Sequence, residues 1–255
     1  MAEREKRIRL VVPVVGEDAD GDDVYGRLGR PGTLISVARV ARGPASIETV
    51  FDGVLAAPDT VRLIVEAERE GMDAVVIDCM DDPGMEAGRE LVSIPVVGPC
   101  QASMHLAAML GSRFSVVTVP DERAATLFED HARAYAISGQ LASVRWVGIP
   151  VLELEEDRER LVRDLVRESA VAVECDRAGV IVLGCTAMVG LAEAVRAELE
   201  GMGITGVPII DPLSVAVRLA EALAELGLSH SKRSYPTPAS KRVFGFEAFA
   251  EEQTC

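Results

Sequence analysis

Two cysteines, Cys79 and Cys185, each stand where an apolar, strand-like segment ends and a helical pattern begins. The first lies in Val-Val-Ile-Asp-Cys-Met-Asp-Asp-Pro-Gly and the second in Val-Ile-Val-Leu-Gly-Cys-Thr-Ala-Met. In an α/β sheet the carboxyl ends of the strands open onto the ligand-binding crevice, and the following helix presents unpaired N–H groups and a positive dipole end that favours a thiolate. The recurrence predicts two equivalent reactive thiols, one at each strand end.

Two facing thiols could remove and return a single proton. Inverting a carbon centre next to a carbonyl requires a base on one face and an acid on the other. Because the pKa of a cysteine, ordinarily about 8.5, falls at helix N-termini, one thiolate and one thiol can coexist near neutral pH. We expect the N–H groups of residues 80–82 and 186–188 to stabilise the developing enolate oxygen. A lone cysteine at a strand end is more often inert packing, so the prediction depends on the pair.

The elements that must position the cysteines follow an alternating pattern of short apolar runs and longer helical segments. Strands are predicted at residues 8–15, 34–39, 74–79, 94–97, 114–119, 144–149, 180–183 and 207–210. Helices are predicted at residues 46–55, 58–71, 83–91, 100–110, 122–138, 155–178, 187–202 and 212–226. The alternation is typical of an α/β protein whose mostly parallel sheets are covered by helices on both faces.

Segments 74–79 and 179–185 form a weak internal repeat, because each ends in a cysteine and is followed by a helix. We therefore predict an α/β fold of two similar Rossmann-like lobes with the active site in the cleft between them. The expected boundaries are 1–98 plus 211–228 for a discontinuous lobe 1, 99–210 for lobe 2, and 229–255 for a C-terminal tail.

Two Asp-Pro pairs mark expected helix starts. Asp82 precedes Pro83 and Asp211 precedes Pro212, so each carboxylate is predicted to cap the helix that begins at the proline.

Two segments are predicted to lie outside helices and strands. Residues 17–32 are rich in Asp, Gly and Arg, which predicts a surface loop that could serve as a lid. The tail is predicted to begin as an exposed linker, and Phe244, Phe246 and Phe249 near its end could dock on the body or on a neighbouring subunit.

The composition favours a soluble, cytoplasmic, globular protein. The chain has 255 residues, 49% hydrophobic content and a formal charge of −15, which disfavours nucleic acid and anionic membranes as partners. The first residues lack the apolar core of a secretory signal, and no stretch is long enough to span a bilayer. Five cysteines without a Cys-x-x-Cys pair fit a reducing compartment. A homo-oligomer is expected, because apolar helix surfaces and the Phe-rich tail need cover.

Other reactive side chains are interpreted as structural. Cys100 is assigned to packing, as is His105 within its apolar helix, and Cys175 and Cys255 are not placed for chemistry. His131 and His230 have no partner evident in the sequence. The aspartates around Cys79 lack a second carboxylate cluster to complete a metal site. The glycines of the 17–32 loop do not form a dinucleotide fingerprint, so a nicotinamide cofactor is disfavoured and no metal is expected.

Several segments together resemble the aspartate/glutamate racemase superfamily, in particular the hydantoin racemase branch that includes allantoin racemase. The matching segments are Gly43-Pro-Ala-Ser-Ile-Glu, Asp78-Cys-Met-Asp-Asp-Pro-Gly-Met, Pro95-Val-Val-Gly-Pro-Cys-Gln-Ala-Ser-Met-His, Arg113-Phe-Ser-Val-Val-Thr and Gly184-Cys-Thr-Ala-Met. The resemblance implies two lobes related by a pseudo-twofold axis, cofactor-independent racemisation, and Cys79 and Cys185 as the acid/base pair.

Two departures from that branch bear on the substrate. Hydantoin racemases commonly carry Asn-Pro-Asn after the first strand, where this chain has Val12-Pro13-Val14. The second cysteine lies in Gly-Cys-Thr instead of the usual Gly-Cys-Ala-Gly.

The resulting hypothesis is a racemase or epimerase acting on a 5-substituted hydantoin or related ureide. The alternatives are an aspartate or glutamate racemase, a maleate-isomerase-like cis/trans isomerase in which one cysteine adds to a double bond, and a non-catalytic accessory protein on the same scaffold. Besides the two cysteines, the residues expected to contact the substrate are Pro13, Ser46, Met80, Asp81, Thr118, Gly184, Thr186 and Ala187.

Overall fold

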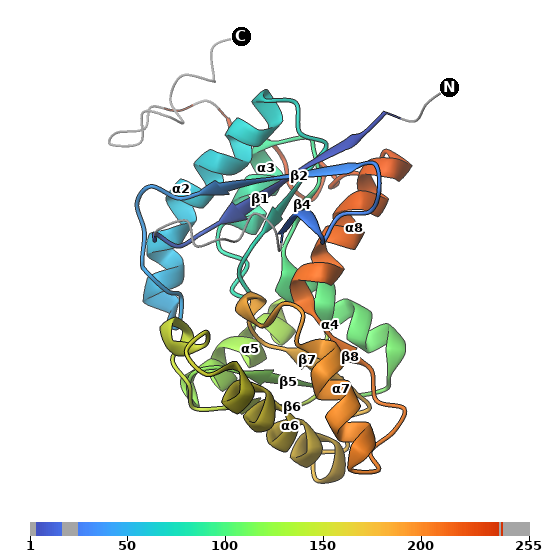
Figure 1. Ribbon diagram of the computed structural model, residues 1–255. Helices are drawn as coiled ribbons and strands as arrows, with labels where there is room; N and C mark the ends of the chain where they lie inside the picture. Colours follow the sequence, from blue (N-terminus) through green and yellow to red (C-terminus); the bar gives the residue numbers. More distant parts are fainter. Residues whose placement is uncertain (1–3, 17–24, 240, 242–255) are drawn as a thin grey trace.

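The computed structural model describes residues 4–16, 25–239 and 241, and it contains two four-stranded parallel sheets (Figure 1). The first sheet has the order β2-β1-β3-β4, built from β1 (Lys6–Val12), β2 (Thr33–Arg39), β3 (Ala74–Ile77) and β4 (Val96–Val97). The second has the order β6-β5-β7-β8, built from β5 (Phe114–Thr118), β6 (Leu141–Trp146), β7 (Val180–Leu183) and β8 (Ile209–Ile210). Each sheet repeats one strand order, which confirms the prediction of two similar α/β lobes.

Helices cover both sheets. They are α2 (Val50–Arg69), α3 (Met85–Leu91), α4 (Pro99–Leu110), α5 (Arg123–Ala134), α6 (Arg158–Glu174), α7 (Ala192–Gly201) and α8 (Pro212–Leu226), with short 3₁₀ turns η1 (Val151–Glu153) and η2 (Thr186–Met188). Although α8 follows the second sheet in sequence, it packs on β1, β3 and β4 of the first sheet and on α4 (Figure 1). Within the described ranges no helix combines the length and the apolar character needed to cross a membrane.

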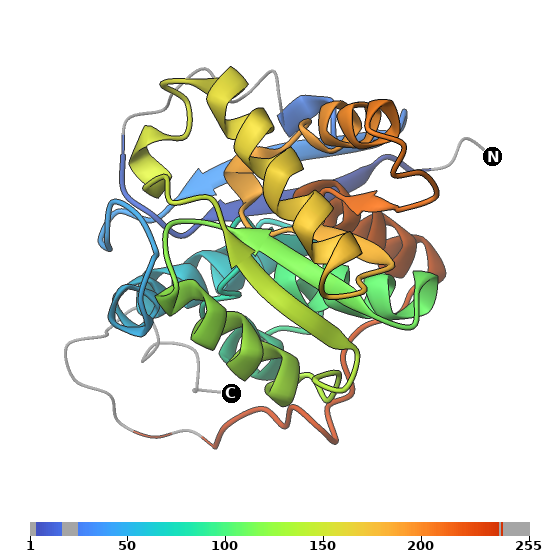
Figure 2. The same ribbon diagram turned by 90° about the horizontal axis from the view of Figure 1, so that it is seen from below.

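The buried strands read as continuous apolar runs because both of their faces are covered. In β7, Val180 and Val182 pack in the cluster formed with α4 and α5, whereas Ile181 and Leu183 pack in the cluster formed with α6 and α7. Figure 2 shows α5 and α6 on opposite sides of this sheet. In β3 the side chains alternate in the same way. Ala74 and Val76 pack with α8 on one face of the sheet, and Val75 and Ile77 pack with α2 on the other.

The prediction of two helices at 46–55 and 58–71 is wrong, because a single helix, α2, continues through Pro58. Proline removes one backbone hydrogen bond from a helix. The residues of the preceding turn, Val54 and Leu55, are exposed, so water can reach the carbonyl that loses its donor. The helix starts at Val50 because Thr49 and Asp52 form a reciprocal capping box ahead of it.

Other predicted boundaries shift by several residues. Segment 187–202 begins as the turn η2 and becomes helical only at Ala192, and helix α6 starts at Arg158, after its cap Asp157. Strand β1 ends at Val12 instead of continuing to residue 15.

Asp82 does not cap the helix after Pro83, contrary to the prediction. Helix α3 starts at Met85, after Gly84, and Asp82 itself adopts a left-handed conformation with φ of 48°. Its carboxylate instead accepts hydrogen bonds from the N–H groups of Cys100 (3.1 Å) and Gln101 (2.9 Å), which lie in the first turn of α4. Asp82 therefore joins the loop after β3 to a helix that begins 17 residues later in the chain.

The second Asp-Pro pair behaves as predicted. Asp211 accepts hydrogen bonds from the N–H groups of Leu213 (3.1 Å) and Ser214 (3.2 Å), and α8 starts at Pro212. The difference between the two pairs lies in the following residues, because Gly84 with φ of 76° interrupts the helix after Pro83.

Burial of Asp82 predicts a pH-dependent stability. Burial, opposed by hydrogen bonds from Gln101, Tyr135 and Cys100, raises the pKa of Asp82 from 3.8 to about 6. Because the folded state then binds the proton more tightly, this contribution to stability is full below about pH 4 and is lost as pH rises through 6. Relative to Asp82→Asn, the wild type should lose about 1.5 kcal/mol of unfolding free energy between pH 5.0 and 7.5. Urea unfolding of both proteins at the two pH values measures this; a difference that stays constant contradicts it.

The described part of the 17–32 loop is anchored to the body, while residues 17–24 lie outside the described residues. Leu28 is buried, and the backbone N–H of Arg30 donates to the buried carboxylate of Glu221 on α8 at 2.7 Å. Tyr25 lies at the start of the described part, three residues before Leu28.

The first half of the tail is mostly exposed, as predicted, but it is attached to the body of the protein. His230 Nε2 accepts a hydrogen bond from the N–H of Val96 at 2.9 Å, and Lys232 Nζ donates to the carbonyls of Arg89 and Glu90 at 2.9 Å each. These contacts hold the segment against α3 and β4 of the first lobe. Residues Phe244, Phe246 and Phe249 lie outside the described residues.

Candidate active site

A cavity of about 380 Å³ lies between the two lobes. Its wall includes the residues that follow the two central strands of each sheet: Val14 after β1, Cys79 after β3, Val119 after β5 and Cys185 after β7. The carboxyl ends of parallel strands are the usual ligand-binding edge of an α/β sheet. The two sheets turn these edges toward one shared space.

The two cysteines occupy equivalent positions in the two lobes. The residue before Cys79, Asp78, donates its N–H to the carbonyl of Val11 on β1, and the residue before Cys185, Gly184, donates its N–H to the carbonyl of Val117 on β5, each at 2.8 Å. Both thiols are free and half-buried, and both line the cavity. Two sulfur atoms thus face one space from opposite lobes.

Neither thiol is stabilised as a thiolate, which corrects the expectation from helix dipoles. Burial, together with the charge of Asp81, raises the pKa of Cys79 well above its usual range, although the N–H of Asp81 donates to Sγ at 3.4 Å. Burial raises the pKa of Cys185 to about 11, opposed by a hydrogen bond from the N–H of Ala187. Because α3 starts only at Met85, Cys79 does not adjoin a helix N-terminus. The surroundings of both sulfurs therefore favour the thiol over the thiolate.

Most of the N–H groups expected to bind an enolate oxygen already have partners. Those of Asp81 and Ala187 point at the sulfurs, and those of Asp82 and Met188 donate to the carbonyls of the two cysteines at 3.1 Å each. These hydrogen bonds hold the sulfur atoms and the backbone carbonyls of the two cysteines in place, so the four N–H groups position the cysteines instead of serving an oxyanion.

The structure places seven of the eight expected contact residues on the cavity wall. They are Ser46, Met80, Asp81, Thr118, Gly184, Thr186 and Ala187. Pro13 is buried and lies behind the wall, while its neighbours Val12 and Val14 line the cavity.

Two of these hydroxyls already have partners within the protein. Thr118 Oγ1 donates to the carbonyl of Gly184 at 3.0 Å, which ties β5 to the residue before Cys185. Thr186 Oγ1 lies 3.4 Å from the carbonyl oxygen of Asp78 and joins the two cysteine-bearing loops across the lobes.

The cavity also contains polar residues that sequence reasoning missed. Tyr25, Arg39, Glu48, Asp78 and Glu155 all line it. Tyr25 Oη donates to the Asp78 carboxylate at 2.8 Å, and burial, opposed by this bond and one from Thr186, raises the pKa of Asp78. Arg39 and Asp78 stand at or just after strand ends, so the rule that singled out the cysteines could have identified them. Nothing in the sequence signalled Tyr25.

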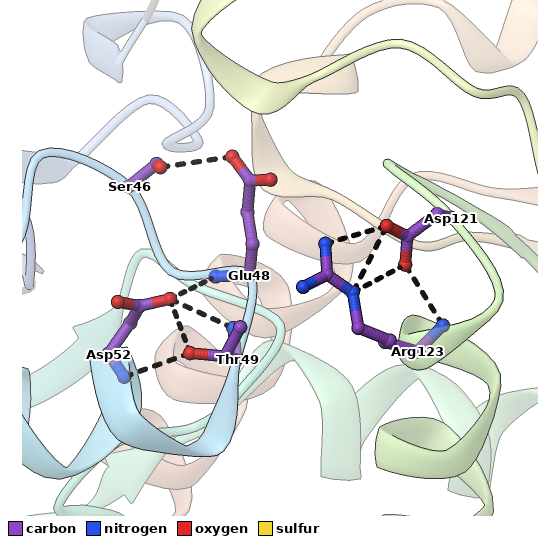
Figure 3. Close-up of polar contacts among 6 residues, drawn as sticks. All are labelled: Ser46, Glu48, Thr49, Asp52, Asp121 and Arg123. Atoms are coloured by element: carbon purple, nitrogen blue, oxygen red, sulfur yellow. Dashed lines mark hydrogen bonds and ion pairs between the residues drawn. The ribbon is translucent and has the colours of Figure 1, made fainter.

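Charged residues of both lobes face each other beside the cavity (Figure 3). In the first lobe, Ser46 Oγ donates to Glu48 at 3.0 Å, and Asp52 accepts from the N–H groups of Glu48 and Thr49. In the second, Arg123 pairs with Asp121 at 2.6 Å, and this pair, with the charges of Glu48 and Asp52, raises the pKa of Arg123. An attraction between opposite charges thus acts across the two lobes.

Comparison with known proteins gives a consistent picture. Residues 23–220 match the Asp/Glu/Hydantoin racemase family. The sequence is 39% identical over 227 residues to the hydantoin racemase of Pseudomonas sp. (strain NS671), covering 88% of each chain. Among solved structures, the allantoin racemase from Klebsiella pneumoniae superimposes with a TM-score of 0.87 at 31% identity, covering 96% of this chain and 99% of that one. The allantoin racemase from Pseudomonas fluorescens has a TM-score of 0.84 at 37% identity, covering 94% and 100%.

Proposed function

Because the chain belongs to the Asp/Glu/hydantoin racemase family, we propose that it is a racemase of 5-substituted hydantoins or related cyclic ureides, in which Cys79 and Cys185 form the acid/base pair. The observation that carries this proposal is the placement of the two cysteines at equivalent strand ends of the two lobes, where both line the same cavity. The reaction needs no cofactor, since both proton transfers use sulfur.

The proposed reaction consists of two proton transfers. One cysteine, as thiolate, takes the proton from the substrate's asymmetric carbon; an S–H bond forms, the C–H bond breaks, and its electron pair moves onto the adjacent carbonyl oxygen as an enolate. The opposite thiol then donates its proton to the other face of that carbon, and the carbonyl re-forms as the S–H bond breaks. The product is the mirror image of the substrate, and the two sulfurs have exchanged protonation states.

The raised pKa values have a cost and a benefit for this chemistry. Few molecules carry a thiolate at neutral pH, but a thiolate whose pKa is high is a stronger base toward a weakly acidic carbon. Burial is the main cause of the high pKa of both Cys79 and Cys185. The cavity thus favours a strong base present at low population over a weak base always present.

The charge of the cavity wall favours a neutral ring over an amino acid or a dicarboxylate. Its arginine and carboxyl side chains are Arg39 on one side of the balance and Glu48, Asp78, Asp81 and Glu155 on the other. Arg39 compensates Asp78, and the acidic side chains of Glu48 and Glu155 would repel a carboxylate substrate, whereas the ring N–H groups of a hydantoin can donate to them. The apolar lining from Leu127, Phe128 and Val151 would take an apolar 5-substituent.

A substrate panel tests the proposal. Purified, reduced protein should abolish the optical rotation of 5-benzylhydantoin, and in D₂O the racemised product should carry deuterium at C5. Because like charges in contact cost several kcal/mol, kcat/KM for hydantoins should exceed that for aspartate or glutamate at least about a hundredfold. A cis/trans isomerase would instead form a covalent adduct with a cysteine, and an accessory protein would leave the whole panel unchanged; either result contradicts the proposal.

We further propose that the chain works as a homo-oligomer in the cytoplasm. The first turns of α2 expose Val50, Phe51, Val54 and Leu55, with exposed fractions between 47% and 69%, and such apolar surface commonly lies in subunit contacts. The unpaired state of the four described cysteines is in keeping with a reducing compartment.

A further inference from the structure

Asp81 is held between two helices that come from different parts of the chain. Its Oδ1 lies 3.2 Å from His131 Nε2 on α5, and both side chains are largely buried, with 12% and 17% of their surface exposed. Its Oδ2 packs against Gly53 of α2, where even one added carbon would lie 2.2 Å from that oxygen. The carboxylate therefore has little room to move.

The His131 ring is also fixed. It stacks on Tyr135, with ring centroids 5.6 Å apart and planes inclined by 9°, and its other contact is the edge of Phe128 at 6.4 Å. Tyr135 is anchored in turn, because its hydroxyl donates to Asp82 at 2.7 Å. These contacts leave Nε2 directed at Asp81.

This pair acts directly on Cys79. Asp81 lines the cavity beside Cys79, its N–H points at Sγ, and its negative charge opposes loss of the thiol proton. A positive charge on His131, 3.2 Å from the carboxylate, would offset that opposition. His131 does not itself line the cavity and so has no direct contact with a bound substrate.

We propose that His131 is a positioning residue for the racemisation: its protonated ring offsets the charge of Asp81 and holds its carboxylate, and thereby makes proton release from Cys79 easier than it would be beside an uncompensated carboxylate. The use made of the thiolate rests on the proposed function; the coupling between the three side chains does not.

The electrostatics of His131 support a protonated ring. Burial lowers its pKa, but the hydrogen bond that Nε2 donates to Asp81 and the charges of Asp82, Asp81 and Asp130 outweigh burial, so the pKa of His131 lies above its ordinary value. The titratable groups around the pair are Asp82 in the same loop, Asp130 and Tyr135 on α5, Cys100 and His105 on α4, and Cys185 across the cavity.

The test follows the alkylation of Cys79 by iodoacetamide in the full-length protein from pH 6.5 to 9.5, with the Cys79 peptide quantified by mass spectrometry. Removing a nearby cation shifts a pKa by about one unit, so His131→Gln should react about tenfold more slowly than wild type at pH 6.5. The two rates should converge above the pKa of His131, where the wild-type ring is neutral. A purely structural role would give a ratio that does not change with pH.

Asp81→Asn, alone and combined with His131→Gln, completes a double-mutant cycle for the His131–Asp81 pair. This variant should react several-fold faster than wild type at pH 9.5, because the carboxylate charge is gone. Adding His131→Gln to it should change nothing at any pH from 7 upward. His105→Gln is the matched control, since His105 also faces Tyr135, at 6.5 Å between ring centroids, but is exposed and has no carboxylate partner in the described part of the chain.

Three results would overturn the proposal: a wild-type to His131→Gln ratio independent of pH, an equal effect of His131→Gln with and without Asp81→Asn, or no acceleration in Asp81→Asn at pH 9.5. The rate of Asp81→Asn at pH 9.5 still tests the proposal if circular dichroism shows that His131→Gln does not fold. The alkylation assay requires no substrate. If the protein racemised no hydantoin but the alkylation rates of the variants followed the expected pattern, the proposed function would be refuted and the coupling between the three side chains would stand.

Discussion

Replacement of Cys79 or Cys185 by serine is expected to lower the rate of hydantoin racemisation about a thousandfold, since general acid or base catalysis contributes roughly 10²–10⁴ and serine has no accessible ionised form. Serine is close to cysteine in size, so the cavity and the fold should persist. Cys175→Ser is the matched control, because Cys175 is exposed at the end of α6 and should tolerate the change.

The two variants should also differ from each other. Each retains one thiol, which can still remove the proton of one enantiomer and return deuterium from D₂O to the same face. Cys79→Ser and Cys185→Ser should therefore exchange the C5 proton of opposite enantiomers without inverting them, as measured by proton NMR of each pure enantiomer. Exchange of the same enantiomer by both variants, or racemisation within tenfold of wild type by either, contradicts the two-cysteine mechanism.

Gly184→Ala is expected to destabilise the protein by about 2–3 kcal/mol, the upper range for overpacking of a filled core. An added Cβ would lie 2.3 Å from Cβ and 2.8 Å from Cα of Thr118, and Thr118 is 1% exposed at the end of a central strand. Because that contact involves the main chain of β5, no side-chain rotation relieves it. The residue after Gly184 is Cys185, so the displacement should also reduce activity.

Gly179→Ala is the matched control, at the other end of the same strand. Its added Cβ would meet only the carbonyl oxygen of Arg113 at 3.5 Å, an ordinary contact. Thermal unfolding should place Gly184→Ala roughly 5–10 °C below wild type, and Gly179→Ala within about 2 °C. Equal melting temperatures for the two variants would contradict the packing argument.

The fold could be predicted from the sequence because its main signals are local. Continuous apolar runs identified the strands, and β7 and α8 lie at the predicted positions 180–183 and 212–226. The same logic placed the two cysteines at strand ends, and the structure brings both to one cavity. The family match confirms the resemblance that those motifs carried.

The parts that failed depend on contacts between distant residues. Asp82 precedes a proline, as a capping residue would, but its partners are the N–H groups of Cys100 and Gln101, which no local pattern reveals. His131 lies 50 residues from its partner Asp81, and Tyr25 lies 53 residues from Asp78. The expectation that one of the two cysteines is readily ionised is opposed for a related reason, because burial in the folded protein outweighs the local hydrogen bonds to the sulfurs.

The return of α8 to the first sheet also bears on how the protein is made. One face of that sheet buries Ile8 and Leu10 against Leu213, Ala216 and Val217 of α8. During synthesis, this face stays uncovered until the ribosome has completed the whole second sheet. The lobe translated first is therefore the lobe completed last, and the nascent chain must keep an apolar surface from aggregating for most of its synthesis.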